Sequence, residues 1–187
     1  MTAASSRPWR FRVLKTATVV RRGGVVLYPT EGVWGVGCDP RNTKAIDRLL
    51  KLKRRPWTKG IILLAHDRKP LSPWVGKPTL PTPPQDGRAT TWVIPTRLGV
   101  SPLLRGKHRS LAVRITEHAP ARELAAACGG VITSTSANLS GFPTPRSRWA
   151  VQRLWRGQVD GFLAAPLGGQ NRPSRIFDTV SQRWIRD

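Results

Sequence analysis

The sequence is short of carboxylates and of long apolar segments. Only 10 of its 187 residues are Asp or Glu, whereas 32 are Lys or Arg, and the formal net charge is +22. No apolar run approaches the length of about 20 residues that a membrane-spanning helix needs, so no such helix is expected. The basic N-terminal residues are not followed by an apolar run, and a secretory signal is therefore not expected either.

Cysteine is also scarce. Cys38 and Cys128 lie far apart, and neither has a Cys or His neighbour at the spacing of metal ligands. This pattern argues against a structural zinc site, and no metal site formed by the protein's own side chains is expected. A reducing cytoplasm is the simplest setting for a chain with so few cysteines, so we expect a cytoplasmic protein.

Several catalytic motifs are missing from the sequence. It contains no GxxxxGK[ST], GxSxG, HExxH or CxxC, which excludes a P-loop, the nucleophile elbow of the α/β-hydrolases, a zinc hydrolase helix and a redox dithiol. If the protein binds phosphate, side-chain cations and hydroxyls have to hold it.

The excess of cations is the most prominent feature that is present. Such a field attracts polyanions and speeds their encounter, so nucleotides and nucleic acids are natural partners. A GC-rich genome, whose codons favour Arg, is the alternative explanation, but it accounts less well for the shortage of carboxylates. We expect part of the charge to contact RNA.

The apolar pattern predicts one α/β domain over residues 1–187, in which residues 1–12 form a loose N-terminal tail. An open, twisted mixed sheet flanked by helices is expected. Residues 69–88 are rich in Pro and Gly, lack periodicity and are expected to be a loop within the domain. Helices are expected over residues 13–22, from a cap at Asn42 or Thr43 to 53, over 121–128, and from a cap at Ser147 to 156. Strands are expected over residues 25–28, 61–65, 92–94, 111–115, 131–133, 162–164, 176–177 and 184–185.

Four polar segments stand at strand or helix ends, where binding groups collect in open α/β sheets. The first, residues 28–32, offers the Thr30 hydroxyl and the Glu31 carboxylate, and an ordinary turn capped by Thr30 explains it equally well. The second is a cluster of cations over residues 53–55 with Lys59. It suits a helix C-terminus, but it also suits a polyphosphate, which we favour because a buried strand follows directly.

The third segment ends an apolar strand at Arg114, which should face the same side as Ala112. A cation on a core strand needs an anion, and either a substrate carboxylate or an internal partner such as Glu117 would serve. The fourth segment, residues 133–141, has five hydroxyls and one amide. Its small polar side chains and accessible backbone suit phosphate or ribose contacts.

Five motifs in order resemble the YrdC/TsaC family of threonylcarbamoyl-AMP synthases, in its short bacterial form, from about residue 13 to the end. Lys-x-Arg (53–55) and Ser-x-Asn (136–138) are that family's signature pairs. The other matching stretches are Tyr-Pro-Thr-Glu (28–31), Ser-Leu-Ala-Val-Arg (110–114) and Pro-Ser-x-Ile-x-Asp (173–178). The resemblance implies a twisted sheet around a concave, positively charged cavity.

The resemblance also implies an activity. L-threonine, bicarbonate and ATP, with Mg²⁺ accompanying ATP, would give threonylcarbamoyladenylate and pyrophosphate, and partner proteins would use the adenylate for t6A modification of adenosine 37 in tRNA. By match, Lys53 and Arg55 would be catalytic, and Thr30, Arg114 and Ser174 would bind threonine. The residues that would bind ATP are Lys53, Arg55, Lys59, Ser134, Ser136, Asn138 and Arg146.

Two other functions compete with this interpretation. A non-catalytic protein of the same fold could bind double-stranded RNA or tRNA, which the charge of +22 supports. The intact Lys-x-Arg and Ser-x-Asn pairs oppose it, because an RNA binder needs cations but not that hydroxyl loop. A carbamoyl-transfer domain related to hydrogenase maturation is the second rival, but such domains normally belong to much longer chains with zinc-finger modules.

Overall fold

The computed structural model describes residues 8–76, 80–81, 86–170 and 172–187. The helices are α1 (Arg10–Arg21), α2 (Thr43–Leu52), α3 (Ser72–Val75), α4 (Pro102–Arg105), α5 (Ala119–Ala127) and α6 (Arg148–Leu154), with short 3₁₀ helices η1 (Trp57–Lys59) and η2 (Lys69–Leu71). The strands are β1 (Val26–Pro29), β2 (Trp34–Gly37), β3 (Ile62–Ala65), β4 (Thr90–Pro95), β5 (Ser110–Ile115), β6 (Val131–Ser136), β7 (Gly161–Phe162), β8 (Arg175–Asp178) and β9 (Arg183–Arg186).

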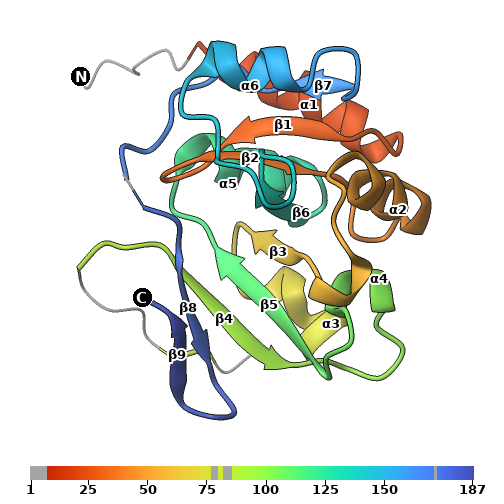
Figure 1. Ribbon diagram of the computed structural model, residues 1–187, viewed down its shortest axis with the longest axis vertical. Coiled ribbons are helices and arrows are strands. Elements are labelled where there is room, and N and C mark those ends of the chain that lie inside the picture. The colour runs from red at the N-terminus through yellow and green to blue at the C-terminus, as the bar shows by residue number, and fades with distance from the viewer. Residues whose placement is uncertain (1–7, 77–79, 82–85, 171) are drawn as a thin grey trace, which may run out of the picture.

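The strands of the described residues form one nine-stranded sheet in the order β7-β1-β2-β6-β3-β5-β4-β8-β9. The β1–β7, β3–β5 and β4–β8 pairs are parallel and the others antiparallel, so the predicted mixed sheet is confirmed. Figure 1 shows its twist from β1 to β9. Within the described part of the chain, no helix is both long and apolar enough to cross a membrane.

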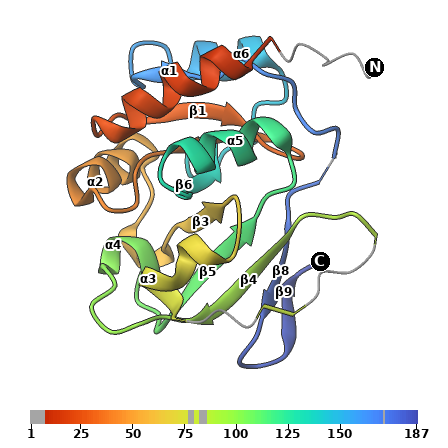
Figure 2. The ribbon, with the colours of Figure 1, turned by 180° about the vertical axis from the view of Figure 1, so that it is seen from behind.

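Each face of the sheet has its own apolar core, as the alternation of buried residues in β1 requires. Val26 and Tyr28 face a cluster formed with α1 and α5, whereas Leu27 faces the other cluster, to which α2 contributes. Figure 2 shows α1 and α5 side by side over the first of these faces. Helices α1 and α5 pack mainly on β7, β1, β6 and β3, and the same face of the sheet continues past them over β5 and β4 (Figure 1).

Three predictions about elements need correction. Helix α1 begins at Arg10 rather than after residue 12, and Trp9, only 8% exposed, anchors its start. Strand β2 was not predicted, because its two glycines hide the apolar alternation. The segment 69–88, predicted to be a loop, contains η2 and α3. Leu71 and Trp74, three residues apart, pack these short helices against the core. Residues 77–79 and 82–85 of that segment lie outside the described residues.

Candidate active site

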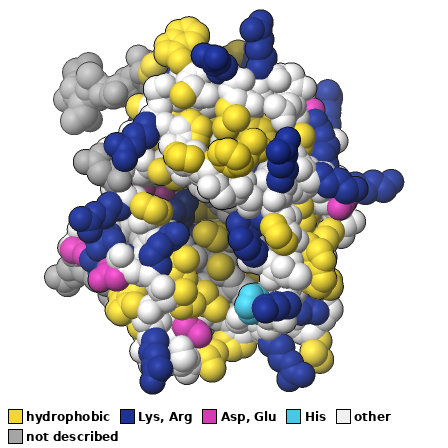
Figure 3. Space-filling model, viewed as in Figure 1, with side chains coloured by type: hydrophobic (Ala, Val, Ile, Leu, Met, Phe, Trp, Pro, Cys, Tyr) yellow, Lys and Arg dark blue, Asp and Glu magenta, His cyan; other side chains and the backbone are white. Residues whose placement is uncertain are grey.

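A cavity of about 520 Å³ lies on the same face of the sheet as the cluster that α1 and α5 cover, farther along the sheet. Ile62 and Ser134, which line it, share that face with Leu64 of the cluster. Figure 3 shows this face hollowed near its centre, with Lys and Arg side chains around the hollow. Among the described lining residues are one carboxylate, Asp178, and five cations: Arg55, Lys59, Arg105, Arg114 and Arg186.

Strand β5 sets the length of the cavity. Its alternate residues Ser110, Ala112 and Arg114 all line the cavity, which confirms that Arg114 faces the same side as Ala112. Four residues of strand span about 13 Å. The neighbouring strands are held in register by the pairs Leu63–Val113 and Ile62–Ser134, so the start of β3 and the end of β6 lie at the Ser110 end.

Arg55 reaches the Ser110 end through the turn that closes α2. The backbone N–H of Arg55 bonds to the carbonyl of Leu50 and that of Arg54 to Lys51, which is the Schellman arrangement at a helix C-terminus. Arg54 takes the left-handed conformation, with φ of 50°, so the chain reverses after it. The Arg55 guanidinium then donates from Nε and Nη2 to the carbonyl of Gly60 at 3.0 and 2.9 Å.

Arg55 keeps its charge in this setting. Burial lowers the pKa of its guanidinium, but arginine starts so far above neutrality that it stays protonated. Lys59 lines the same end of the cavity. Two cations, of which Arg55 is held in place by its hydrogen bonds, therefore face the space beside the end of β6, and such a pair suits a phosphate chain.

The end of β6, where the hydroxyl loop (residues 133–141) begins, contributes Ser134 and Ser136 to the cavity lining. The Ser136 hydroxyl donates to Asn138 Oδ1 at 2.5 Å. Asn138 Nδ2 donates to the carbonyls of Leu139, at 3.0 Å, and Phe142, at 2.6 Å. Asn138 is not among the lining residues, and its amide shapes the loop from within.

Two other predicted ATP-binding residues lie off the cavity surface. Lys53 is buried, 2% exposed, and its ammonium donates to the backbone carbonyls of Ser136 and, at 2.5 Å, Asn138. Burial, with a smaller effect from Arg55, lowers the pKa of Lys53 to about 8. Arg146 is exposed and does not line the cavity.

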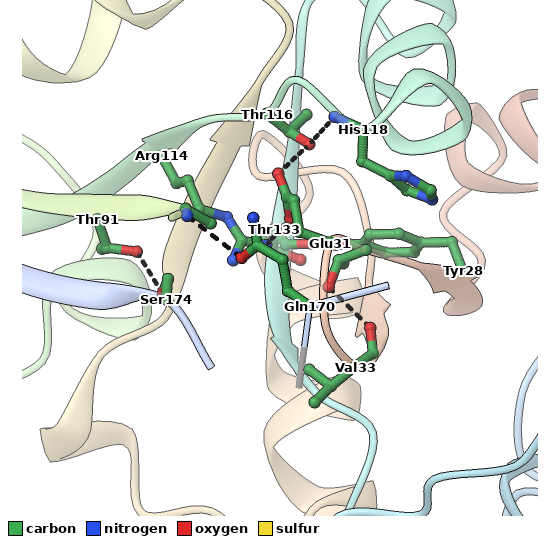
Figure 4. A network of polar contacts seen from close by, with 12 residues as sticks. Tyr28, Glu31, Val33, Thr91, Arg114, Thr116, His118, Thr133, Gln170 and Ser174 are labelled. Carbon is green, nitrogen blue, oxygen red and sulfur yellow. Dashed lines mark hydrogen bonds and ion pairs between the residues drawn. The ribbon is translucent and has the colours of Figure 1, made fainter. Parts of the chain in front are cut away.

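Arg114 marks the other end of the cavity, and its partner is Glu31 rather than Glu117 (Figure 4). Arg114 Nη2 lies 3.5 Å from Glu31 Oε2, whereas Glu117, past the end of β5, is exposed. Thr116 donates to Glu31 Oε1 at 2.6 Å. Burial by itself raises the pKa of Glu31, but Arg114 and Thr116 together hold it below its usual value. Arg114 Nε has no hydrogen-bond partner among the described residues.

Thr30 and Ser174 complete this end. Thr30 Oγ1 donates to the carbonyl of Val33 at 2.7 Å, so it closes its turn and lines the cavity at once. The Ser174 hydroxyl lies 2.9 Å from that of Thr91, and Arg186 donates to the Ser174 carbonyl at 2.9 and 2.6 Å. The structure thus brings seven of the ten predicted residues to one cavity: Thr30, Arg55, Lys59, Arg114, Ser134, Ser136 and Ser174.

Some lining residues carried no role in the sequence interpretation. Arg105 ends α4 and His108 follows it, in a region without a recognisable motif, and Arg186 lies in the last strand. Asp178 was part of a matched motif but had no role assigned to it. Arg186 ends the stretch Arg-Trp-Ile-Arg (183–186), which has no alternation that would have distinguished it from the many other cations of the chain.

Comparison with known proteins settles the family. The family model Sua5/YciO/YrdC, described as "Telomere recombination", matches residues 18–187. The chain belongs to this family. A relative from Methylococcus capsulatus, named threonylcarbamoyl-AMP synthase, is 44% identical over 180 residues, which cover 94% of this chain and 97% of that one. A relative of the same name from Pseudomonas syringae is 39% identical over 186 residues, covering 94% and 97%.

Solved structures of the Sua5/YciO/YrdC family share the fold. P. abyssi Sua5, crystallised with L-threonine, has a TM-score of 0.80 at 23% identity; the match covers 91% of this chain and 52% of that one. E. coli YciO has a TM-score of 0.75 at 22% identity, covering 95% and 91%. The chain thus spans nearly all of YciO but about half of P. abyssi Sua5.

Proposed function

We propose that this chain is a threonylcarbamoyl-AMP synthase, which forms L-threonylcarbamoyladenylate and pyrophosphate from L-threonine, bicarbonate and ATP. Relatives 39–44% identical over nearly their whole length bear that name. The structural observation behind the proposal is that stretches far apart in the sequence meet at one cavity. All five motifs of the sequence supply at least one residue to the same cavity: Thr30, Arg55, Arg114, Ser136 and Ser174.

The two ends of the cavity suit the two parts of such a reaction. At the Ser110 end, Arg55 and Lys59 would hold the phosphates of ATP, while Ser134 and Ser136 would bind the nucleotide beside the loop that Asn138 shapes. Arg146 would join them only by turning in from the surface. At the other end, Arg114 would receive the threonine carboxylate, and Thr30 and Ser174 would position the amino acid.

The chemistry needs no covalent nucleophile. Bicarbonate and the amine of threonine give a carbamate with loss of water. A carbamate oxygen then attacks the α-phosphorus of ATP, and pyrophosphate leaves with the electrons of the broken P–O bond. The protein has to align the two reactants and offset the negative charge that grows on the leaving group. Fixed cations such as Arg55 at the phosphate end do this.

Mg²⁺ would enter with ATP, held by its phosphates. The described residues contain no group of three His, Cys, Asp or Glu that could hold a metal ion. Mg²⁺ commonly takes one or two carboxylates together with substrate phosphates, and Asp178 is the carboxylate present among the described lining residues. The adenylate would pass, in the cytoplasm, to partner proteins that complete the tRNA modification.

A pyrophosphate-release assay tests the proposal. We expect release from ATP to require both L-threonine and bicarbonate, with the threonylcarbamoyladenylate detected by mass spectrometry. Serine, which lacks the methyl group, is the matched control substrate and should react more slowly. Tight binding of duplex RNA without pyrophosphate release would overturn the proposal in favour of an RNA-binding protein.

A further inference from the structure

The buried ammonium of Lys53 lies under the hydroxyl loop, not in the cavity. Lys53 follows α2, whereas the two carbonyls that it binds belong to Ser136, the last residue of β6, and to Asn138 just beyond it. The backbone N–H of Ser140 bonds back to the carbonyl of Lys53 at 3.0 Å. The loop is thus fastened to this one residue at three points, from both its side chain and its backbone.

Trp155 completes the inner boundary of the loop. Its Nε1 donates at 2.9 Å to the carbonyl of Ala137, the residue between the two that Lys53 binds. Trp155 is 1% exposed, so three consecutive carbonyls, of residues 136 to 138, are all turned toward buried side chains. Two converging carbonyl oxygens would repel one another without a shared cation, and an ammonium with three donors satisfies them.

The inward carbonyls fix where the next amides point. In a trans peptide the C=O and the following N–H point in opposite directions. Because the carbonyls of Ala137 and Asn138 point inward, the N–H groups of Asn138 and Leu139 are directed away from Lys53 and Trp155. The N–H of Ala137, which follows the Ser136 carbonyl, already donates to the carbonyl of Trp34 at 2.8 Å, so the N–H groups of Asn138 and Leu139 are the ones suited to an anion beside the Ser136 hydroxyl.

We propose that Lys53 is a positioning residue: it holds the carbonyls of the Ser136–Asn138 loop inward so that the loop's hydroxyl and amides are presented to the phosphates of ATP. The inference rests on the proposed function for the identity of the ligand, but not for the restraint on the loop. It departs from the role that the family resemblance implies for Lys53, which is direct contact with ATP.

The burial of Lys53 distinguishes a positioning role from direct contact with ATP. A direct phosphate ligand needs a charged group that reaches the cavity surface, as those of Arg55 and Lys59 do. Lys53 is 2% exposed and is absent from the described lining residues, and two of its three N–H donors are engaged by the loop. Its contribution to binding therefore passes through the loop.

Hydrogen exchange on the protein without nucleotide provides the first test. Lys53→Met removes the ammonium but keeps the length of the side chain. We expect the hydrogen-bonded amides of the loop, those of Ala137, Ser140 and Phe142, to exchange at least about tenfold faster, because two carbonyls lose their donors. Lys51→Met is the matched control: Lys51 is exposed, pairs with Asp47, and should leave exchange of the loop unchanged.

Chemical rescue provides the second test. In Lys53→Ala, n-propylammonium replaces the missing atoms and should restore both slow exchange of the loop and the affinity for ATP, measured by calorimetry. In the pyrophosphate assay, the loss should fall mainly on KM for ATP. Lys53→Arg, too large for the buried site, should not rescue, and circular dichroism will confirm that each variant is folded.

The outcomes separate the inference from the proposed function. Faster exchange and weaker ATP binding in Lys53→Met support the positioning role even if no pyrophosphate is ever released. Unchanged exchange of the loop together with lost ATP binding overturns it, because Lys53 would then contact ATP directly. Unchanged exchange and unchanged ATP affinity overturn it as well.

Discussion

The two cations of the Lys-x-Arg motif stand two residues apart in the sequence and serve different parts of the molecule. Lys53 points under the hydroxyl loop and Arg55 into the cavity. The left-handed conformation of Arg54 between them produces the separation, since it reverses the chain at the end of α2. A left-handed residue other than glycine costs about 1 kcal/mol, a strain that the Schellman bonds offset.

Arg55→Ala should lower the rate of pyrophosphate release by at least about a hundredfold, since it removes a fixed cation from the charge that develops on the leaving group. The fold should survive, because the Arg55 side chain donates only to the Gly60 carbonyl among the described hydrogen bonds, and its backbone bond to Leu50 is kept in alanine. Arg54→Asn, which tolerates the left-handed conformation, is the control. Turnover unchanged in Arg55→Ala would remove the phosphate role.

Removing the Arg114 guanidinium should raise KM for threonine about tenfold or more while KM for ATP changes less. Arg114→Gln alone also leaves the Glu31 carboxylate buried without its cation, which destabilises the protein. The double variant Glu31→Gln with Arg114→Gln removes both charges, and should recover stability without recovering threonine affinity. An effect confined to ATP in steady-state kinetics would reassign Arg114.

The Glu31 carboxylate should make stability depend on pH in the acid range. Its pKa lies below the usual 4.5 in the folded protein, so between these two values the unfolded chain binds more protons. Stability is therefore fully present above about pH 4.5 and is lost as the pH falls toward the folded pKa. The difference in unfolding free energy between wild type and Glu31→Gln, measured at pH 6 and pH 3, should shrink at the lower pH; a constant difference would contradict this.

At the scale of elements, helix α2 connects the core to the site. Its buried face of Ala45, Ile46, Leu49 and Leu50 fixes the helix against the sheet. Its C-terminus then delivers both Lys53 and Arg55. Interactions that stabilise the start of this helix therefore also help to fix the positions of Lys53 and Arg55 at its end.

Asn42→Ala should lower the free energy of unfolding by about 1 kcal/mol. The Asn42 side chain accepts a hydrogen bond from the Ala45 N–H at 3.0 Å, which satisfies one of the free donors of the first turn. Thr43, the other candidate cap, is the first helical residue, so Thr43→Ala should be near neutral or slightly stabilising. Urea titrations of the two variants check this, and an equal loss in both would contradict the assignment of the cap.

At the scale of the whole molecule, the sheet divides the chain into two cores, and each encloses one cysteine. Cys38 belongs to one cluster and Cys128 to the other. Burial raises the pKa of each thiol to about 12. Neither thiol is therefore ionised near neutral pH.

Both thiols should resist labelling as long as the fold is intact. At pH 8, a disulfide reagent such as DTNB should react with fewer than one thiol per chain within minutes and with both once the protein is unfolded in urea. Because each cysteine reports one core, the rate of labelling at each site also reports the opening of that face. Rapid labelling of the native protein would contradict the burial of the thiols.

The sequence by itself determined the mixed α/β class, most of the elements and the five motifs, because apolar periodicity and capping chemistry are local. It did not yield β2, whose glycines carry no apolar alternation, or the short helices in 69–76, whose burial depends on distant residues. Tertiary structure alone decided that Glu31 rather than Glu117 meets Arg114, and that Lys53 supports the loop instead of lining the cavity. Those outcomes depend on how strands far apart in the chain are paired and on how the chain reverses after α2. Long-range geometry of this kind is not present in the spacing of the residues.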